Sequence, residues 1–256
     1  MFLSREQYGR LLLGKSVNVL GINIRCFTIK EVIDNIGIEK YDSTLSLLNV
    51  DKLELMMFLK QDLDAYSLIQ LHMLIPGLDE TLADLIQIFL DPKEVVWNKE
   101  SFEIKAVSKD GSSILLNQKN YRNFFRSIAD IYNVSLNETE EDVVFGTESA
   151  KYNWRRYQHA LREGRRRDAA YNSCIDLFSV ISSVINIGKL YKYDNIENLT
   201  IFQLYDSFYR LDHYETCKSI DKIRTSGMID TSKINLPDIH WYDIIKNVSN
   251  GNVFET

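Results

Sequence analysis

Residues 27–48 read FTIKEVIDNIGIEKYDSTLSLL, and this stretch predicts a helix-rich fold. Thr28 and Glu31 form a capping box, in which each side chain can accept a hydrogen bond from the backbone N–H of the other residue at a helix start. Gly37 provides a stop signal, because glycine readily adopts the left-handed conformation that ends many helices. The apolar residues between them recur at the i, i+3, i+4 and i+7 spacing of one helix face and are Ile29, Val32, Ile33 and Ile36.

A second stretch with the same organisation lies near the C-terminus, where residues 198–211 read NLTIFQLYDSFYRL. Thr200 and Gln203 form another capping box, which predicts a helix start. The apolar positions that keep helical spacing after it are Ile201, Leu204, Tyr205, Phe208 and Leu211. Its aromatic side chains are more typical of a packed core than of a ligand site, and Tyr209 and Tyr214 are the members expected to be more exposed.

Outside these two stretches, helical and strand patterns alternate. Alternating residues around Gly21 predict a short hairpin near residues 16–26, and Asp110-Gly111 predicts another within residues 95–116. The expected fold is therefore mainly α with minor antiparallel β (α+β), bundle-like with one or two short hairpins. Helices are predicted over about 41–48, 53–74, 80–90, from about 121, over about 149–187 and around Trp241. The helix over 53–74 is rich in Leu and Met and is expected to be buried, and the helix from about 121 has Phe124, Phe125 and Ile128 on one side.

The acidic run at residues 137–148 predicts a loop that divides the chain. On this interpretation an N-terminal helical region with both hairpins covers residues 1–136, and a C-terminal helical region covers residues 149–256. No internal repeat or low-complexity tract interrupts either part.

The composition predicts a soluble, intracellular globular protein. The 256 residues are 45% hydrophobic and include only 3 Pro and 11 Gly, so a core can form and few helix breaks are forced. The net charge of −6 disfavours long-range attraction to nucleic acid. The 3 Cys are far apart with no C-x-x-C pair, which favours a reducing compartment without disulfides. The sequence shows neither a membrane span nor a secretion signal, so no membrane contact is expected.

The most prominent charged feature is the basic stretch 155–167, in which arginines alternate with aromatic residues as in some nucleic-acid-binding helices. Three interpretations stay open: a solvated or internally paired face, a protein-binding surface, and a nucleic-acid-binding surface. The acidic residues beside the stretch favour the first and make nucleic acid the weakest. The candidate partner-binding residues are Arg155, Arg156, Arg162, Arg165, Arg166, Arg167 and Tyr209.

Motifs that carry chemistry are missing from the sequence. There is no G-x-S-x-G turn, no Cys–His signature and no phosphate-binding loop. His213 and Cys217 stand at i, i+4, but a structural zinc site needs about four ligands and no second pair lies nearby in sequence. We therefore expect no enzyme activity, no cofactor and no metal.

Two segments carry a family resemblance. The stretch 27–48 and the segment NIENLTIFQLYDSFYRL at 195–211 resemble phrases found in tail-morphogenesis proteins of phages that infect Gram-positive bacteria. The order of the segments also resembles that of these phage proteins: a helical N-terminal part is followed by a hairpin region, a basic helix and the NLTIFQLYD helix. The chain is similar, over about half its length, to the phage tail assembly chaperones.

The resemblance implies a non-enzymatic role in which the chain escorts the tape-measure protein while tail tube subunits assemble around it. The expected partners are phage tail proteins (tape-measure, tail tube or baseplate) or further copies of the chain, and the expected location is the host cytoplasm during assembly. The chain is long for a simple chaperone, which leaves a permanent subunit of the virion tail or baseplate as an alternative. A regulator that binds nucleic acid through 155–167 is the second alternative.

Overall fold

The structure is a computed structural model that describes residues 3–109, 111–140, 143–171, 176–189 and 191–225. It confirms the α+β class, since helices dominate and the strands form two small antiparallel sheets. The elements in chain order are α1 (Arg5–Leu12), β1 (Val17–Val19), β2 (Ile22–Ile24), α2 (Ile29–Glu31), the π-helix η1 (Val32–Ile36), α3 (Ile38–Ser46), the 3-10 helix η2 (Leu47–Asn49), α4 (Lys52–Leu59), α5 (Leu68–Leu74), α6 (Leu78–Leu90), β3 (Pro92–Asn98), β4 (Glu103–Ser108), β5 (Ser113–Leu116), α7 (Tyr121–Tyr132), α8 (Glu148–Tyr171), α9 (Leu177–Asn186), α10 (Tyr193–Ile196) and α11 (Ile201–Thr225).

Both predicted capping boxes form, and they pair with each other. Thr28 caps α2 and Thr200 caps α11, each in reciprocal hydrogen bonds with the residue three positions later. The two threonines also form an isolated antiparallel bridge. The N–H groups of Ile29 and Ile201 donate to carbonyls of the opposite segment at 2.9 and 2.8 Å. The two sequence stretches that predicted the fold therefore meet at one point of the core.

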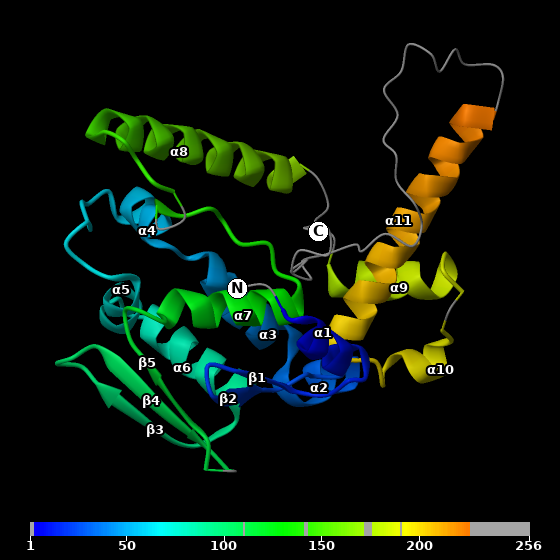
Figure 1. Ribbon diagram of the computed structural model, residues 1–256, viewed down its shortest axis with the longest axis horizontal. Coiled ribbons are helices and arrows are strands. Elements are labelled where there is room, and N and C mark those ends of the chain that lie inside the picture. Colours follow the sequence, from blue (N-terminus) through cyan, green and yellow to red (C-terminus); the bar gives the residue numbers. More distant parts are fainter. Residues whose placement is uncertain (1–2, 110, 141–142, 172–175, 190, 226–256) are drawn as a thin grey trace, which may run out of the picture.

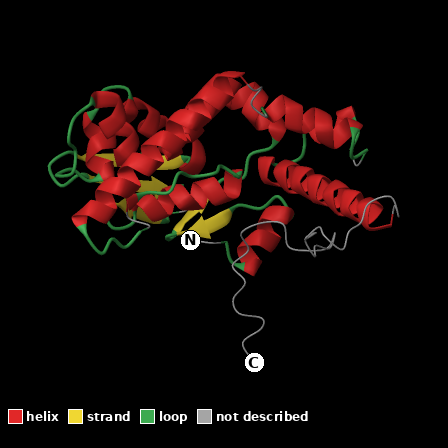
Figure 2. Ribbon diagram, turned by 90° about the horizontal axis from the view of Figure 1, so that it is seen from above, coloured by secondary structure: helices red, strands yellow, loops and turns green. Residues whose placement is uncertain are grey.

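The predicted hairpin at residues 16–26 is confirmed by β1 and β2, whose register pairs Val17 with Ile24. The predicted hairpin at 95–116 is part of a larger unit, because β3 adds a third strand to β4 and β5 in the order β3-β4-β5. Gly111, in the turn between β4 and β5, has a φ of 84°, which glycine adopts without strain. Both views place this three-stranded sheet at the end of the molecule opposite to α11 (Figures 1 and 2).

Two predicted helices are each split in the structure, so both predictions are wrong in extent. The helix expected over 53–74 is α4 followed by a loop and then α5, because Lys60 adopts a left-handed conformation and Ser67 begins a new capping box with Gln70. The helix expected over 149–187 is α8 and a separate α9, because Asp176 is extended and caps α9 by accepting a hydrogen bond from Ser179. The helix predicted around Trp241 lies outside the described residues.

The main core gathers side chains from both ends of the chain. α7 supplies Phe124, Phe125 and Ile128, all fully buried, as its helical spacing predicted. α9 and α11 contribute to the same cluster, for example through Val180 and Leu204. The division of the chain at residues 137–148 stays a prediction.

A buried histidine organises one side of this core. The Nε2–H of His72 donates to the Val50 carbonyl at 2.7 Å, so Nδ1 accepts from the hydroxyl of Tyr121 at 2.8 Å. The ring stacks on Phe125. Burial lowers the pKa of His72 to about 4, because the charged form loses its contact with water.

Candidate functional site

The basic helix α8 lies across α4 at the outside of the molecule (Figure 1). One face of α8 carries polar and cationic side chains at the i, i+4, i+7, i+11 and i+14 positions, which share one side of a helix. These side chains bond to α4, to the loop after it and to the acidic segment 137–140. They are Lys151, Arg155, Gln158, Arg162 and Arg165.

Arg162 is the deepest of these contacts. Its guanidinium donates two parallel hydrogen bonds to the carboxylate of Asp51, both at 2.7 Å, and each of the two side chains is only 4% exposed. Glu54 adds a second carboxylate at 3.6 Å, and the carbonyl of Glu138 accepts from Nη2 at 3.1 Å. Asp51 also caps α4 by accepting from the N–H of Glu54 at 2.8 Å. The bidentate pair therefore connects α8 directly to the start of α4.

A second cluster lies nearer the start of α8. Arg155 bonds to the carboxylate of Glu140 through Nε and Nη2, and to Asp64 at 2.6 Å. Lys151 approaches Glu140 at 3.2 Å and Asp64 at 3.8 Å. The hydrogen bond from Arg155 is the main cause of the lowered pKa of Asp64, and the bond to Glu140 is the main cause of the raised pKa of Arg155. The two basic side chains thus neutralise acidic residues of this chain.

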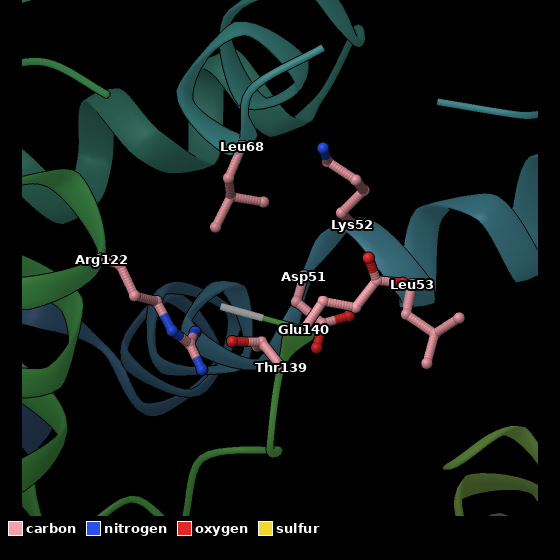
Figure 3. A pocket seen from close by; sticks show the side chains of 7 residues that line it. All are labelled: Asp51, Lys52, Leu53, Leu68, Arg122, Thr139 and Glu140. Atoms are coloured by element: carbon pink, nitrogen blue, oxygen red, sulfur yellow. The ribbon is translucent and has the colours of Figure 1, made fainter. Parts of the chain in front are cut away.

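Asp51 also lines a small cavity of about 80 Å³ (Figure 3). Arg122 extends into it from one side, opposite Asp51 and Glu140, and Leu53, Leu68, Lys52 and Thr139 complete the lining. The guanidinium of Arg122 is buried and donates to the carbonyl of Asn137 at 3.0 Å. At this size the cavity is well below the usual volume of a pocket for an organic ligand, about 300–1,000 Å³.

The predicted set of partner-binding residues is divided by the structure. Arg155 and Arg162 point toward the body of the protein, as the internally paired interpretation expected. Arg156 is exposed with its guanidinium 6.0 Å from the ring of Tyr152, and Arg165 is exposed and donates to Asn137 at 3.2 Å. The side chains of Arg166 and Arg167 lie outside the described part. Partner binding by the set stays a prediction.

Tyr209 does not join the arginines. It lies on α11, where its hydroxyl accepts a hydrogen bond from Asn133 at 2.7 Å, and its ring packs against Tyr205 and Phe208. This contact helps to hold α11 against the end of α7. A role for Tyr209 in partner binding also stays a prediction.

An open groove of about 540 Å³ between α4 and α8 was missed by the sequence reasoning. Phe58, the next residue of α4 after Met57, is not part of the lining and is 80% exposed. The sequence of α4, KLELMMFL, is mostly apolar with no separate polar face, and this pattern led to the prediction of a buried helix. This helix has no polar face and is followed directly by the polar residues 60–62 (KQD), and this combination could have indicated an exposed apolar surface. The groove is lined by Met56, Met57, Lys60, Gln61, Asp62, Arg155 and His159.

His213 and Cys217 are adjacent on α11, with Nε2 and Sγ 3.8 Å apart. Within the described ranges, no group of three or more His, Cys, Asp or Glu side chains is arranged to hold a metal ion. The described helices also include none that is long and apolar enough to cross a bilayer.

The described chain is thus a helix-rich α+β protein with an ion-paired basic helix and, beside it, an open groove that two methionines and five polar or charged residues line. Residues 166–246 match the model of a protein family described as the YomV second domain. This family is phage-derived, of the Bacillus phage SPBc2 type, and the match runs from the end of α8 through α9, α10 and α11. Comparisons with curated proteins and with solved structures gave no match. The family match agrees with the phage resemblance of the sequence.

Proposed function

We propose that this chain is a non-enzymatic phage tail morphogenesis protein, a tail assembly chaperone that binds the tape-measure protein, the tail tube protein or both. Its sequence resembles such proteins at 27–48 and 195–211, and its C-terminal part matches a phage-derived family. The host cytoplasm during assembly is the corresponding location. A chaperone of this kind needs a surface that accepts a helix of its client and later releases it.

The groove between α4 and α8 is the observation that carries this proposal. An amphipathic helix binds by placing its apolar face in such a groove. Met56 and Met57 offer flexible, polarizable side chains, which adapt to clients of different shape. Phe58 offers an aromatic side chain that is 80% exposed in the free protein and can be buried by a client.

The ion pairs of α8 prepare the groove for binding. Arg155 lines the groove and is also bonded to Asp64 and Glu140, so its position is fixed before a client arrives. Arg162 holds the middle of α8 to the start of α4. A surface that is already ordered loses less conformational entropy on binding, which increases affinity.

The test is co-purification of the tape-measure protein with Phe58→Ala. The matched control is Phe178→Ala, which removes another exposed aromatic side chain (54% exposed) from α9. Phe58→Ala is expected to weaken binding at least tenfold, or about 1.4 kcal/mol, whereas the control leaves it unchanged. Both variants should keep the stability of the parent, because neither ring lies in the core. Equal binding by the two variants would contradict the assignment of the groove.

A structural subunit of the tail or baseplate is the second candidate. The outer face of the β3-β4-β5 sheet favours it, because Val96 and Leu115 flank Lys105 there and are 47% and 45% exposed. Such a face suits a permanent subunit contact. Mass spectrometry of purified virions separates the two roles: a chaperone should be missing, and a subunit should be present at a stoichiometric copy number.

The nucleic-acid alternative has its own test. Arg155 and Arg162 are already engaged by carboxylates, so fewer cations remain for phosphate. A gel shift over a range of salt concentrations should show no binding, because phosphate contacts produce a steep salt dependence when they form. Sub-micromolar binding in physiological salt that is lost when Arg165, Arg166 and Arg167 are all replaced by alanine would favour the regulator instead.

A further inference from the structure

The two edges of the three-stranded sheet differ. At the β5 edge, the carbonyl of Leu115 accepts a hydrogen bond from the side chain of Asn120 at 2.7 Å. The β1-β2 turn also lies against this edge, where a Cβ on Gly21 would be 3.7 Å from the carbonyl oxygen of Ser113. β3 forms the other edge, on the outer side of the sheet (Figure 1). In the described part of the chain, no loop or side chain bonds to the backbone of residues 93–97 at this open edge.

The pairing of the strands determines which backbone groups point to the open edge. In an antiparallel sheet, the N–H and C=O groups of one residue point to one neighbouring strand, and those of the next residue point to the other side. Lys105 of β4 lies opposite Leu115 on one side and Val96 on the other. The Leu115 groups point away from β4, so those of Lys105 point to Val96. Val95 and Trp97, on either side of Val96, therefore direct their N–H and C=O groups to the open edge.

The part of β3 that can accept another strand is short. A bulge interrupts the register between Pro92 and Glu94, and the strand ends at Asn98. Because bulges twist an edge and limit its pairing, the regular part is residues 94–98, with Val96 at its centre. The side chain of Val96 lies on the outer face and is 47% exposed. An added strand has to match this short segment, which restricts its register.

We propose that the open edge of β3 pairs with the same edge of a second copy of the chain. The two strands run antiparallel about a two-fold axis at Val96, so Val95 of each copy lies opposite Trp97 of the other. Each of these pairs exchanges both of its N–H···O=C hydrogen bonds, which uses all the outward backbone groups of residues 94–98. The two Val96 side chains meet at the axis, where the Cα atoms are about 4.5 Å apart.

The side chains favour a second copy as the occupant, because the segment is complementary to itself in this register. On the outer face, Glu94 of each copy lies opposite Asn98 of the other. The Oδ1 atom of Asn98 already accepts from two backbone N–H groups of the following turn, at 3.0 and 3.1 Å, so its amide N–H groups remain to donate to the carboxylate. On the other face, Val95 packs beside Trp97 of the second copy, and such aromatic and β-branched pairs stabilise sheets.

The covered β5 edge limits the assembly to two copies. Once the β3 strands pair, both outer edges of the joined sheet are β5 strands, which are covered against a third copy. The association should be weak, because Lys93 of each copy comes near Lys99 of the other at the ends of the pairing. It should strengthen with salt, which screens these charges. The proposal is independent of the tail assembly function.

Sedimentation velocity of the full chain measures this pairing. The parent should change from a monomer of 29.8 kDa to a dimer as its concentration rises, between about 1 µM and 1 mM for a weak association. Val96→Glu should weaken the association at least about tenfold, since two carboxylates would lie opposite each other at the axis. The matched control Leu115→Glu adds the same charge to the same face at 45% exposure, but two strands from the open edge, and should leave the association unchanged.

A cross-link tests the register and does not depend on the folding of Val96→Glu. Val96→Cys should form a disulfide-linked dimer under mild oxidation, because about 4.5 Å between Cα atoms lies within disulfide range. Leu115→Cys should form none above the background of the parent, because these positions would be five strand spacings, or about 24 Å, apart. The proposal is overturned if the parent stays monomeric at about 1 mM, which would leave the edge to another protein.

Two further outcomes would also overturn the proposal. Leu115→Glu might weaken the association as much as Val96→Glu, which would place the contact on the face of the sheet and not at its edge. Val96→Cys might cross-link no faster than Leu115→Cys, which would exclude the two-fold axis at Val96.

Discussion

Replacing Arg162 by alanine is the most informative test of how α8 is attached. The side chain donates two hydrogen bonds of 2.7 Å to Asp51, and both partners are 4% exposed. The variant keeps α8 helical, since alanine is the best helix former. It leaves the carboxylate of Asp51 buried without its guanidinium, with Glu54 close by.

The expected cost follows from this geometry. Removing one partner of a buried ion pair typically destabilises a protein by about 3–5 kcal/mol, because the remaining charge is no longer compensated. Solvent screening reduces this value little, since water hardly reaches the pair. The lost bond to the Glu138 carbonyl and the second carboxylate of Glu54 favour the upper part of the range. For a chain of this size the melting temperature should fall by about 6–20 °C.

Urea denaturation followed by circular dichroism measures the change in the free energy of unfolding. The control Arg156→Ala removes a guanidinium from the same helix that lies 6.0 Å from one ring, so it should cost at most about 1 kcal/mol. The double variant Arg162→Met, Asp51→Asn removes both charges and keeps an oxygen to cap α4, so it should be more stable than Arg162→Ala. The reasoning is refuted if Arg162→Ala is no more destabilising than Arg156→Ala.

Three further predictions concern the core. Thr200→Ala should lower the free energy of unfolding by about 1 kcal/mol through loss of an N-cap. Leu204→Ala should lower it by about 2–5 kcal/mol, because it leaves a cavity at a fully buried position. Chemical denaturation checks both values, and an unchanged free energy of unfolding for Leu204→Ala would contradict the observed packing. The pKa of His72 is about 4 in the folded protein and 6.5 in the unfolded chain, so its contribution to stability is fully present above about pH 6.5 and is lost as the pH falls through the folded pKa. Denaturation curves between pH 4 and 7 should show this loss in the parent and a smaller loss in His72→Phe, and parallel pH profiles would exclude His72 as the cause.

The contacts of α8 explain why a protein with net negative charge contains such a basic helix. Arg155 and Arg162 bind acidic residues of the chain and hold the helix in place. Tyr152 and Tyr157, on other sides of the helix, are each 61% exposed. The same helix therefore has one face that fixes it to α4 and other faces that are open to a partner.

The sequence by itself determined the α+β class, both hairpins and the start of the key helices. Thr28 with Glu31 and Thr200 with Gln203 could be recognised because a capping box joins residues only three positions apart. The core face of α7 could be recognised for the same reason, since helical periodicity is a local property. Breaks such as those at Lys60 and Asp176 were missed, because apolar periodicity continued on both sides of each break.

Only the tertiary structure decided the roles of the arginines and the position of the groove. Arg162 and Asp51 are 111 residues apart in sequence, and no local pattern indicates that they meet. The apolar residues of α4 predicted burial on every side, yet Phe58 is exposed because α8 covers only one side of that helix and bonds to it through charges. Periodicity identifies which side chains share a face, but the identity of the group that meets that face depends on contacts between distant segments.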